Sequence, residues 1–565
     1  MDLDSDIATK LNEPCSRRVS IRQTLHDCKK CQCKRKELTR LSRSIRAPIG
    51  PCRIQTSLNR RLGWHLLRRQ SKLITGMVVR PYGSRRILAE EPFRSVVVKK
   101  RGQFMSTQSH VSRRQWLAGS AAAAVGSFLI LPQRARGANE RLNVAGVGVG
   151  GMGGNDLRQV GPTENVVGLC DVDANSLARA ATHFPEAKTY RDFRQMLEAQ
   201  KDIDAVMIAT PDHTHAVITM MALKMGKHVF CQKPLTRTVN EAILIGRAAE
   251  DAGVATQMGN QGQASEAARL ICEFIWAGAI GRVREIHSWS NRRPEISPRG
   301  IPRPAETPPV PSHLDWDLWL GPAPQRPYHP CYHPFHWRSW WDFGTGVLGD
   351  IGCHNLSAAF KALKLGWPTS VEACSTHWNA PLEVSNETAP LASIVTFQYG
   401  RRGIRLDGNA PEWGEDMYDG SHPTRSPELV IRWYDGGMMP PQPAGVEPGR
   451  NIFAGEGTLI VGDSGMLLGH RLLPDARNQQ FGRPPQVLPR SPGHYQEWLD
   501  ACKGGPPAGS NFPDHAAHLT AVVLMGNIAI RTGEKLLWDD QKLEFTNSPA
   551  ANQLLDADYR DGWSL

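Results

Sequence analysis

The sequence of 565 residues lacks an apolar run long enough to cross a membrane. Its longest weakly apolar stretch, residues 117–131, is interrupted by Gly and Ser and is shorter than the ~20 residues that a transmembrane helix needs. We therefore expect no stable membrane span in the mature protein. The sequence also contains no internal repeat.

Paired cysteines and metal-ligand clusters are also missing. Five of the twelve cysteines lie in residues 1–104, and the other seven form an odd set without paired spacing. Such a set does not indicate a disulfide framework. Cys28, Cys31 and Cys33 have no nearby partner cluster that would complete four metal ligands, so no metal site is expected.

The part of the chain after residue 104 has no net positive charge. The whole chain has 67 Lys and Arg against 55 Asp and Glu, a net charge of +12, which alone would suggest a nucleic-acid or anionic-membrane partner. Residues 1–104 hold 25 Lys and Arg and 8 Asp and Glu, so they carry +17 and the rest carries −5. This mildly acidic remainder does not favour nucleic-acid binding.

Residues 1–104 contain turn residues and scattered arginines but no sustained apolar period. We expect this segment to be unfolded, or to precede the natural start of translation. Met105 supports the second interpretation, because it begins a segment with the form of a complete signal peptide.

Residues 105–137 are predicted to be a twin-arginine signal peptide. The run Ser-Arg-Arg-Gln-Trp-Leu at 112–117 matches the twin-arginine pattern, and the small residues at 135–138 offer a cleavage site. The alternative is a buried Ala-rich helix. The signal implies the twin-arginine export machinery as a partner, and a periplasmic or otherwise extracytoplasmic location.

A glycine-rich turn follows the first expected strand, residues 142–147. Gly148, Gly150 and Gly153 fit the pattern Gly-x-Gly-x-x-Gly, in which the chain turns tightly and starts a helix whose N-terminus faces a pyrophosphate. A second register that starts at Gly146 would shorten the strand to four residues, so we prefer the first.

An acidic residue ends the second expected strand, residues 166–170. Asp171 lies 23 positions after Gly148, where an acid would accept hydrogen bonds from the ribose of the adenosine half. It would also repel a 2′-phosphate, so NAD is predicted over NADP. The alternative is that Asp171 caps a helix that begins at Ala174.

Strands and helices then alternate along the chain. Strands are expected at 205–209, 228–231 and 255–258, and helices at 215–225 and 239–252. This order predicts an α/β fold with a doubly wound parallel sheet, and we assign residues 138–263 to a Rossmann domain. The ends of its strands should face the cofactor.

Two of those strand ends carry distinctive motifs: Thr-Pro-Asp-His-Thr-His at 210–215 and Gln-Lys-Pro-Leu-Thr at 232–236. With them the chain resembles the Gfo/Idh/MocA family of oxidoreductases, from about residue 142 to near the C-terminus. The resemblance implies that Lys233 contacts the reacting hydroxyl and the cofactor, and that Thr210, Pro211 and His215 border the cofactor. Gln232 replaces the usual Glu of the family, which removes a negative charge beside Lys233.

A second pair of residues completes the resemblance. Asp350 and His354 are four positions apart, so on a helix they project from one face. The family likeness implies that His354 is the general acid/base and that Asp350 assists it. The alternatives are a capping Asp with an unrelated His, or half of a metal site.

Aromatic residues crowd the segment between these motifs. Five of the sixteen tryptophans fall within the 26 residues 316–341. Aromatic faces stack on sugar rings, so we predict His336, Arg338 and Trp341 as substrate contacts. The alternative for each ring is that it packs a long Pro-rich loop onto the second domain or onto a subunit partner.

Residues 264–565 are predicted to form an α+β substrate domain with a largely antiparallel sheet. Its expected strands are residues 282–290, 429–433 and 457–461, and residues 515–532 are predicted to form a helix near the C-terminus. The expected function is NAD-dependent oxidation or reduction of a sugar or cyclitol hydroxyl by a homo-oligomer. The alternatives are an NAD-dependent glycosidase that oxidises its sugar transiently, and a non-catalytic sensor.

Overall fold

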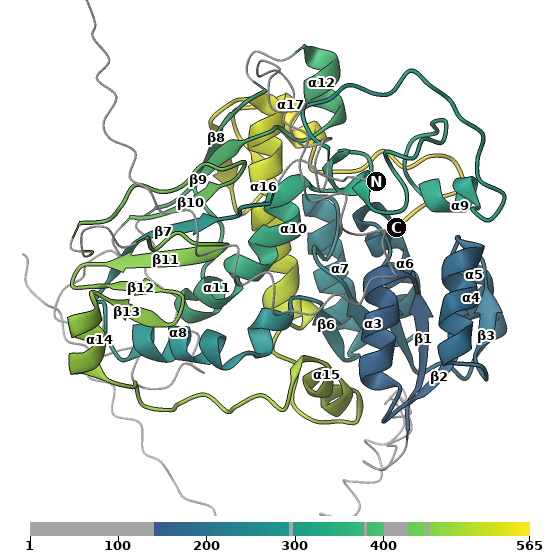
Figure 1. Ribbon diagram of the computed structural model, residues 1–565, viewed down its shortest axis with the longest axis horizontal. Helices are drawn as coiled ribbons and strands as arrows, with labels where there is room; N and C mark the ends of the chain where they lie inside the picture. Colours follow the sequence, from purple (N-terminus) through teal and green to yellow (C-terminus); the bar gives the residue numbers. More distant parts are fainter. Residues whose placement is uncertain (1–140, 293–297, 378–380, 401–427, 445, 447–450) are drawn as a thin grey trace, which may run out of the picture. The chain divides into compact units, whose positions relative to one another are not determined.

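The computed structural model describes residues 141–292, 298–377, 381–400, 428–444, 446 and 451–565, which belong to one compact unit (Figure 1). The predictions for residues 1–104 and for the signal peptide at 105–137 lie outside the described residues. In the part that is described, no helix is long and apolar enough to cross a bilayer.

A six-stranded parallel sheet forms the first part of the described chain, residues 143–258, as predicted. Its strands, in spatial order, are β3 (Lys188–Tyr190), β2 (Asn165–Cys170), β1 (Asn143–Val147), β4 (Ala205–Ile208), β5 (His228–Cys231) and β6 (Thr256–Met258). The order reverses between β1 and β4, which is where a Rossmann sheet opens a crevice for a dinucleotide. The edge strand β3 was not predicted, because it has three residues and none is buried.

Helices cover both faces of this sheet. One face packs on α3 (Gly151–Val160) and α4 (Ala174–His183), and the other on α5 (Phe193–Ala199), α6 (Asp212–Lys224) and α7 (Val239–Ala252). Alternate strand residues supply the two cores: Val144 packs in one and Ala145 in the other, both fully buried.

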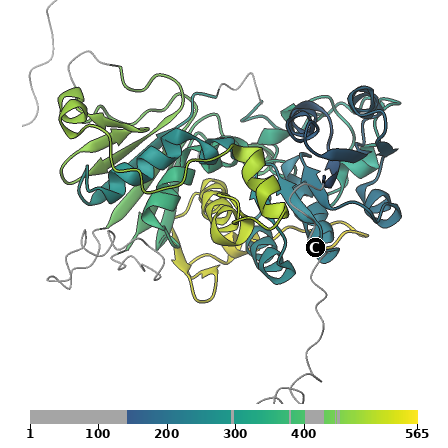
Figure 2. The ribbon, with the colours of Figure 1, turned by 90° about the horizontal axis from the view of Figure 1, so that it is seen from below.

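A helix from the second half of the chain completes the first core. In α15 (His494–Cys502), Trp498 is fully buried and packs edge-on against Phe230 of β5, with ring centroids 5.6 Å apart. Figure 2 shows this helix from below, beside the parallel sheet. The core of the first sheet therefore draws on residues beyond the predicted boundary at residue 263.

The second sheet has nine strands and is largely antiparallel, as predicted. In spatial order they are β13 (Arg471–Leu473), β12 (Met466–Leu468), β11 (Gly457–Gly462), β7 (Val283–Trp289), β10 (Leu429–Tyr434), β9 (Ser393–Tyr399), β8 (Ser370–Ser375), β14 (Leu536–Asp539) and β15 (Glu544–Phe545). Among these, β7 and β10 pair in parallel.

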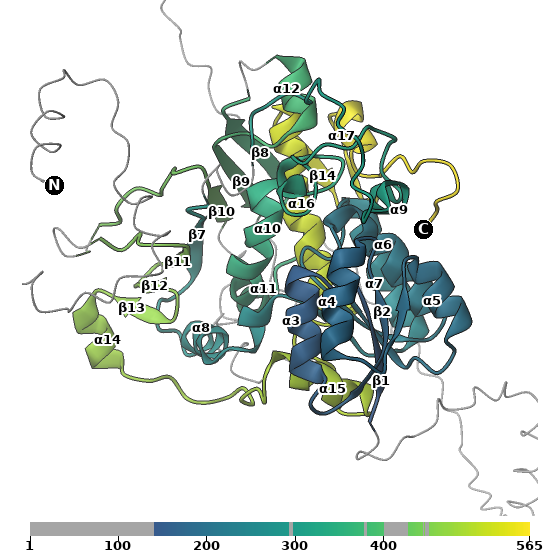
Figure 3. The ribbon, with the colours of Figure 1, turned by 45° about the vertical axis from the view of Figure 1, so that its right-hand side comes forward.

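Helices also lie between the two sheets. They are α8 (Glu266–Trp276), α10 (Gly346–Asn355), α11 (Ser357–Leu363) and α16 (Ala517–Thr532). Helix α16 is buried along nearly its whole length and packs against α7 on one side and against α10 and β8 on the other (Figure 3). It thereby joins the Rossmann half to the second sheet through one continuous core.

The remaining elements are short. They are η1 (Gln261–Ala264), α9 (Trp316–Leu320), η2 (His336–Ser339), α12 (Leu382–Glu387), α14 (Asp475–Phe481), η3 (Phe512–Ala516) and α17 (Pro549–Gln553).

Candidate active site at the ends of the parallel strands

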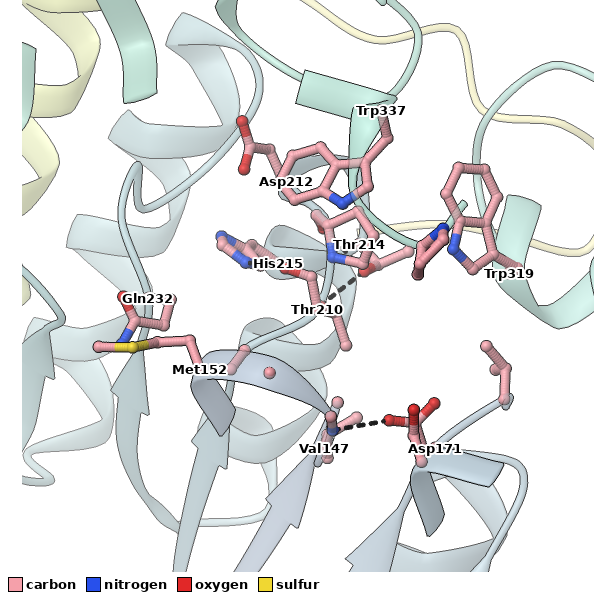
Figure 4. A pocket seen from close by; sticks show the side chains of 18 of the residues that line it. Val147, Met152, Asp171, Thr210, Asp212, Thr214, His215, Gln232, Trp319 and Trp337 are labelled. Atoms are coloured by element: carbon pink, nitrogen blue, oxygen red, sulfur yellow. Dashed lines mark hydrogen bonds between the residues drawn. The ribbon is translucent and has the colours of Figure 1, made fainter. Parts of the chain in front are cut away.

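A cleft of about 630 Å³ lies at the carboxyl ends of the strands of the parallel sheet. Residues that follow β1, β2, β3, β4, β5 and β6 line it, as expected for a Rossmann crevice. Its opposite wall comes from the segment between Leu318 and His354, together with Trp563. Figure 4 shows Trp319 and Trp337 on this wall, facing the strand ends that carry Val147 and Thr210.

The glycine turn adopts the first of the two predicted registers. Gly148 follows the last residue of β1 and has a φ of +77°, and a Cβ there would lie 2.8 Å from the backbone of Ala209. A Cβ at Gly153 would lie 1.9 Å from the Gly148 carbonyl oxygen. Gly150 precedes α3, whose N-terminus therefore faces the cleft with bare backbone.

Asp171 lines the same cleft at the end of β2. Its carboxylate accepts hydrogen bonds from the backbone N–H of Gly150, at 3.1 Å, and of Asp173, at 2.9 Å. Burial raises the pKa of Asp171 to about 6 despite these hydrogen bonds. The alternative role of helix cap belongs instead to Asp173, which accepts from the N–H of Asn175 at the start of α4.

These features fit the adenosine and pyrophosphate of NAD. The backbone at Gly148 and Gly150 leaves no side chain in the way of a pyrophosphate, and the start of α3 supplies a positive dipole end. Asp171 stands at the strand end where a ribose diol would be held.

The residues after β4 form the floor of the cleft. Thr210 accepts a hydrogen bond from the hydroxyl of Thr214 at 2.7 Å, and Pro211 precedes α6. The ring nitrogens of His215 face the carbonyl oxygens of Pro234, at 2.8 Å, and of Thr210, at 2.9 Å. His215 thus ties the end of β4 to the end of β5. Burial lowers its pKa, but Cys231 and these two carbonyls outweigh burial, so the pKa is raised.

Lys233 and Asp350 form a direct ion pair in the cleft. The Lys233 ammonium donates to the Asp350 side-chain oxygen Oδ1 at 2.5 Å and to the Asp350 backbone oxygen at 2.7 Å. Burial alone would raise the pKa of Asp350, but the charges of Lys233 and Arg338 lower it to about 2. Asp350 is therefore ionised at neutral pH, and it fixes the position of the Lys233 ammonium group.

His354 lies one helical turn after Asp350 in α10 and also lines the cleft. Burial lowers its pKa to about 3, and the charge of Lys233 acts in the same direction. The imidazole is therefore neutral at physiological pH. The structure brings Lys233, Asp350 and His354 together, from the end of β5 and one face of α10.

A second titratable group, Asp212, lines the cleft at the start of α6. Its side chain is buried and accepts a hydrogen bond of 2.7 Å from the hydroxyl of Thr345. Burial raises its pKa to about 7, although the Thr345 hydroxyl and the charge of Lys233 oppose the shift. Asp212 is absent from the predicted site residues, and its place after Pro211 at a strand end is the signal that points to it.

The side-chain amide of Gln232 has a hydrogen-bond partner that a Glu at this position could not serve. Its Nε2 donates to a carboxylate oxygen of buried Asp156 in α3 at 2.7 Å, and the Tyr495 hydroxyl donates to the other at 2.7 Å. A Glu at position 232 would place a second carboxylate beside Asp156. The departure from the family motif therefore matches the local hydrogen bonding of this chain.

Arg338 is held rigidly on the far wall of the cleft. Its guanidinium carbon lies 4.2 Å from the ring centre of Phe335 and 4.4 Å from that of Trp337, so it sits against both rings. Its Nε is 3.5 Å from Asp350 Oδ1. Phe335, Trp337 and Arg338 all line the cleft, where they can border a substrate next to Lys233.

The other two predicted substrate contacts lie elsewhere. His336 and Trp341 are not among the residues that line the cleft. Trp341 is 5% exposed and packs in the main core, with the guanidinium of Arg531 5.7 Å from its ring centre. Helix η2 turns the chain so that Trp337 and Arg338 face the cleft while His336 does not.

Most aromatic rings of this segment pack against one another in a core of their own, an arrangement that neither interpretation of the sequence described. Trp316 stacks on Trp319 with ring centroids 4.6 Å apart, and Tyr332 and Trp340 are at most 1% exposed in the same cluster. Trp319 belongs to this cluster and also borders the cleft. The rings thus fix the loop that carries Phe335, Trp337 and Arg338.

Two family models match the chain in this arrangement. Residues 142–260 match the oxidoreductase family with an NAD-binding Rossmann fold, and residues 303–374 match its C-terminal alpha/beta domain. These two regions are similar to the two domains of the Gfo/Idh/MocA oxidoreductase family. The first domain of this chain is therefore an NAD-binding Rossmann domain, in agreement with the cleft at its strand ends.

Relatives with known names match in part of their length. The levoglucosan dehydrogenase of Pseudarthrobacter phenanthrenivorans is 31% identical over 237 residues, which is 42% of this chain and 51% of the relative. The inositol 2-dehydrogenase of Burkholderia multivorans is 29% identical over 184 residues, which is 32% of this chain and 54% of the relative. The matched part thus spans about half of each relative.

Among solved structures, the WlbA dehydrogenase from Bordetella pertussis, in complex with NADH and UDP-GlcNAcA, matches part of this chain. It is 15% identical with a TM-score of 0.47, and the match covers 71% of this chain and 99% of that one.

Proposed function

We propose that this protein is an NAD-dependent oxidoreductase that acts on a hydroxyl-bearing carbon of a sugar or cyclitol. The proposal rests on one observation above all: Lys233, Asp350 and His354 converge in the cleft of an NAD-binding domain. The names of the relatives, a levoglucosan and an inositol dehydrogenase, support the same substrate class.

Lys233 positions and polarises the substrate hydroxyl. Two of the three N–H bonds of its ammonium group go to Asp350, and the third can serve the hydroxyl oxygen. Arg338 and Trp337 border the sugar from the opposite wall. NAD supplies the nicotinamide that accepts or returns the hydride.

Oxidation of the carbinol also releases the hydroxyl proton, and two groups of the cleft can accept it. His354 is neutral but a weak base because its pKa is about 3, whereas the pKa of Asp212 is about 7. A general base works best when its pKa is near the working pH. Asp212 therefore sets the pH dependence of the oxidation. The rate of oxidation should rise as the Asp212 carboxylate ionises through about pH 7.

The variant Asp212→Asn tests this assignment, because an amide still accepts the Thr345 hydroxyl but does not titrate. The kcat/KM of oxidation should lose its dependence on pH near 7 and fall at least ~100-fold at high pH. If kcat/KM of the Asp212→Asn variant still rises near pH 7, Asp212 does not have this role. In His354→Gln the rise of kcat/KM near pH 7 should remain, although the rate at every pH should be lower.

An NAD-dependent glycosidase is the second candidate, favoured by the presence of two acid/base groups in one cleft. After transient oxidation of the sugar, one group can remove the proton next to the carbonyl while the other protonates the departing oxygen. Asp212 and His354 both line the cleft and are available for these two roles.

A single screen separates these candidates. The purified protein is incubated with free sugars and with nitrophenyl glycosides, while absorbance of NADH and of nitrophenol is recorded. Net NADH and a keto sugar are expected for a dehydrogenase, whereas nitrophenol without net NADH would indicate the glycosidase. Sugar binding without any turnover would indicate a sensor and overturn the proposal.

Export through the twin-arginine machinery is the proposed route to an extracytoplasmic location. Its support is the sequence at 112–117, which lies outside the described residues. Replacement of Arg113 and Arg114 by Lys should hold the protein in the cytoplasm, as cell fractionation would reveal. Unchanged export of that variant would contradict the proposal.

A protein exported in folded form must carry its NAD along. We expect near-stoichiometric NAD(H) in purified mature protein to which none was added, measured by mass spectrometry after denaturation. A protein that arrives empty and releases NADH in each cycle would instead be a conventional dehydrogenase.

A further inference from the structure

The segment from residue 556 to 565 returns to the Rossmann half and places one aromatic ring in the cleft. Trp563 lines the cleft although it lies more than 200 residues from the other residues of that wall. Its ring centre is 6.2 Å from that of Phe193, the first residue of α5. No local pattern in the sequence pointed to this placement.

The indole ring is fixed by a charged neighbour. The guanidinium carbon of Arg194 lies 4.6 Å from the ring centre of Trp563. Arg194 is itself held by Asp192, whose carboxylate accepts hydrogen bonds from Nε, at 3.0 Å, and Nη2, at 2.7 Å. Arg194 therefore covers one side of the indole, while the ring also borders the cleft.

The segment is anchored by the residues that precede this ring. Arg560 donates to the backbone oxygens of Gly321, at 2.5 Å, and Asp317, at 2.7 Å, and to the Asp317 carboxylate at 2.6 Å. Tyr559 donates to Glu241 of α7 at 2.6 Å. These anchors join the segment to the loop after α9 and to the Rossmann helices.

The position of Trp563 corresponds to the adenosine end of the cleft. Phe193, which it packs against, follows β3, and β3 is next to β2, whose end carries Asp171. In a Rossmann sheet the acid at the end of β2 holds the adenosine ribose, so the adenine lies on this side. Lys233, at the end of β5, belongs to the other side of the sheet's switch point.

We propose that Trp563 packs against the adenine of bound NAD and that the anchored segment 556–565 slows release of the cofactor. A planar indole offers a base a large apolar surface at little conformational cost. This inference rests on NAD binding and not on the sugar chemistry, so each can fail without the other.

The test is the rate at which bound NADH leaves the full-length protein, followed by its fluorescence after a chase with excess NAD. Trp563→Ala should raise this rate about tenfold, as expected for loss of one base–aromatic contact, and Trp563→Phe should raise it less. Phe481→Ala, which removes an exposed ring outside the cleft, is the control and should leave the rate unchanged.

Two half-cofactors then locate the contact. In Trp563→Ala, binding of ADP should weaken about tenfold, whereas binding of nicotinamide mononucleotide should stay within twofold of the original. Equal weakening of both, or an unchanged NADH release rate in both Trp563 variants with an unchanged melting temperature, would overturn the inference. A parent protein that binds no NADH would overturn the cofactor assignment as well.

Discussion

The two walls of the cleft are built in different ways. The cofactor wall consists of residues that directly follow parallel strands, so Gly148, Asp171, Thr210 and Lys233 are brought together by the sheet itself. The substrate wall consists of loop residues whose positions depend on an aromatic cluster behind them. The order of the strands determines which residues meet on the cofactor wall. On the substrate wall, the packing of the aromatic cluster determines which residues meet.

The difference is visible in single residues. On the cofactor wall, each predicted strand end contributes to the cleft. On the substrate wall, Trp337 and Trp341 have nearly the same exposure, 7% and 5%, but only Trp337 borders the cleft. Their spacing in the sequence does not distinguish a ring that faces a ligand from a ring that faces the core.

The largest expected effect comes from this tryptophan pair. Replacing either ring by Ala removes a buried side chain, so Trp337→Ala and Trp341→Ala should each lower the free energy of unfolding by about 3–5 kcal/mol. Only Trp337→Ala should also raise the KM for the sugar, since only Trp337 borders the cleft. Thermal unfolding and steady-state kinetics of the milder Phe variants would check this, and an equal KM change in both would contradict it.

The sequence predicted the parallel sheet, the glycine turn and the position of Asp171 at a strand end, whereas the roles of Lys233, Asp350 and His354 are implied by the family resemblance and stay predictions. It could do so because strand ends and a four-residue helical spacing are local features with fixed geometry. It missed β3 and α15, since a three-residue edge strand has little pattern and α15 joins the first core from more than 250 residues away.

The same distinction explains where the substrate wall differs from the expectation. His336 was predicted as a contact and lies outside the cleft lining, while Trp563 lines the cleft and was not predicted. Both outcomes depend on how distant segments pack, which a single sequence does not display.

The second prediction concerns Lys233, which lies on the cofactor wall, and His354, which lies on the opposite wall. Lys233→Ala should lower turnover at least ~100-fold while NADH binding is retained, and His354→Ala should lower turnover less, because His354 is the weaker base of the cleft. Lys233→Ala also leaves Asp350 without its ion-pair partner, so the pKa of Asp350 should rise from about 2. Turnover near that of the parent protein, measured with the same sugar, would remove the residue from the mechanism.

The third prediction tests the buried amide behind the cofactor wall. Gln232→Glu should destabilise the fold by about 1–3 kcal/mol, because it replaces a donor to Asp156 with a second carboxylate in a buried place. The double variant Gln232→Glu with Asp156→Asn restores a donor and should recover most of the loss. Urea unfolding measures both, and additive losses in the double variant would refute the pairing.

The smallest expected effect concerns cofactor choice at the end of β2. Asp171→Ser removes the carboxylate that would hold the ribose diol and repel a 2′-phosphate, so the preference for NAD over NADP should fall about tenfold. Asp173→Ser is the matched control: Asp173 lies two residues away and caps α4 through the N–H of Asn175, and a Ser can keep this cap, so cofactor choice should not change. Ratios of dissociation constants for NADH and NADPH, measured by fluorescence for both variants, give the answer. If the ratio stays the same in Asp171→Ser, or shifts equally in Asp173→Ser, then the carboxylate at the strand end does not choose the cofactor. In that case the cofactor wall, like the substrate wall, would owe its specificity to residues that the sheet order alone does not identify.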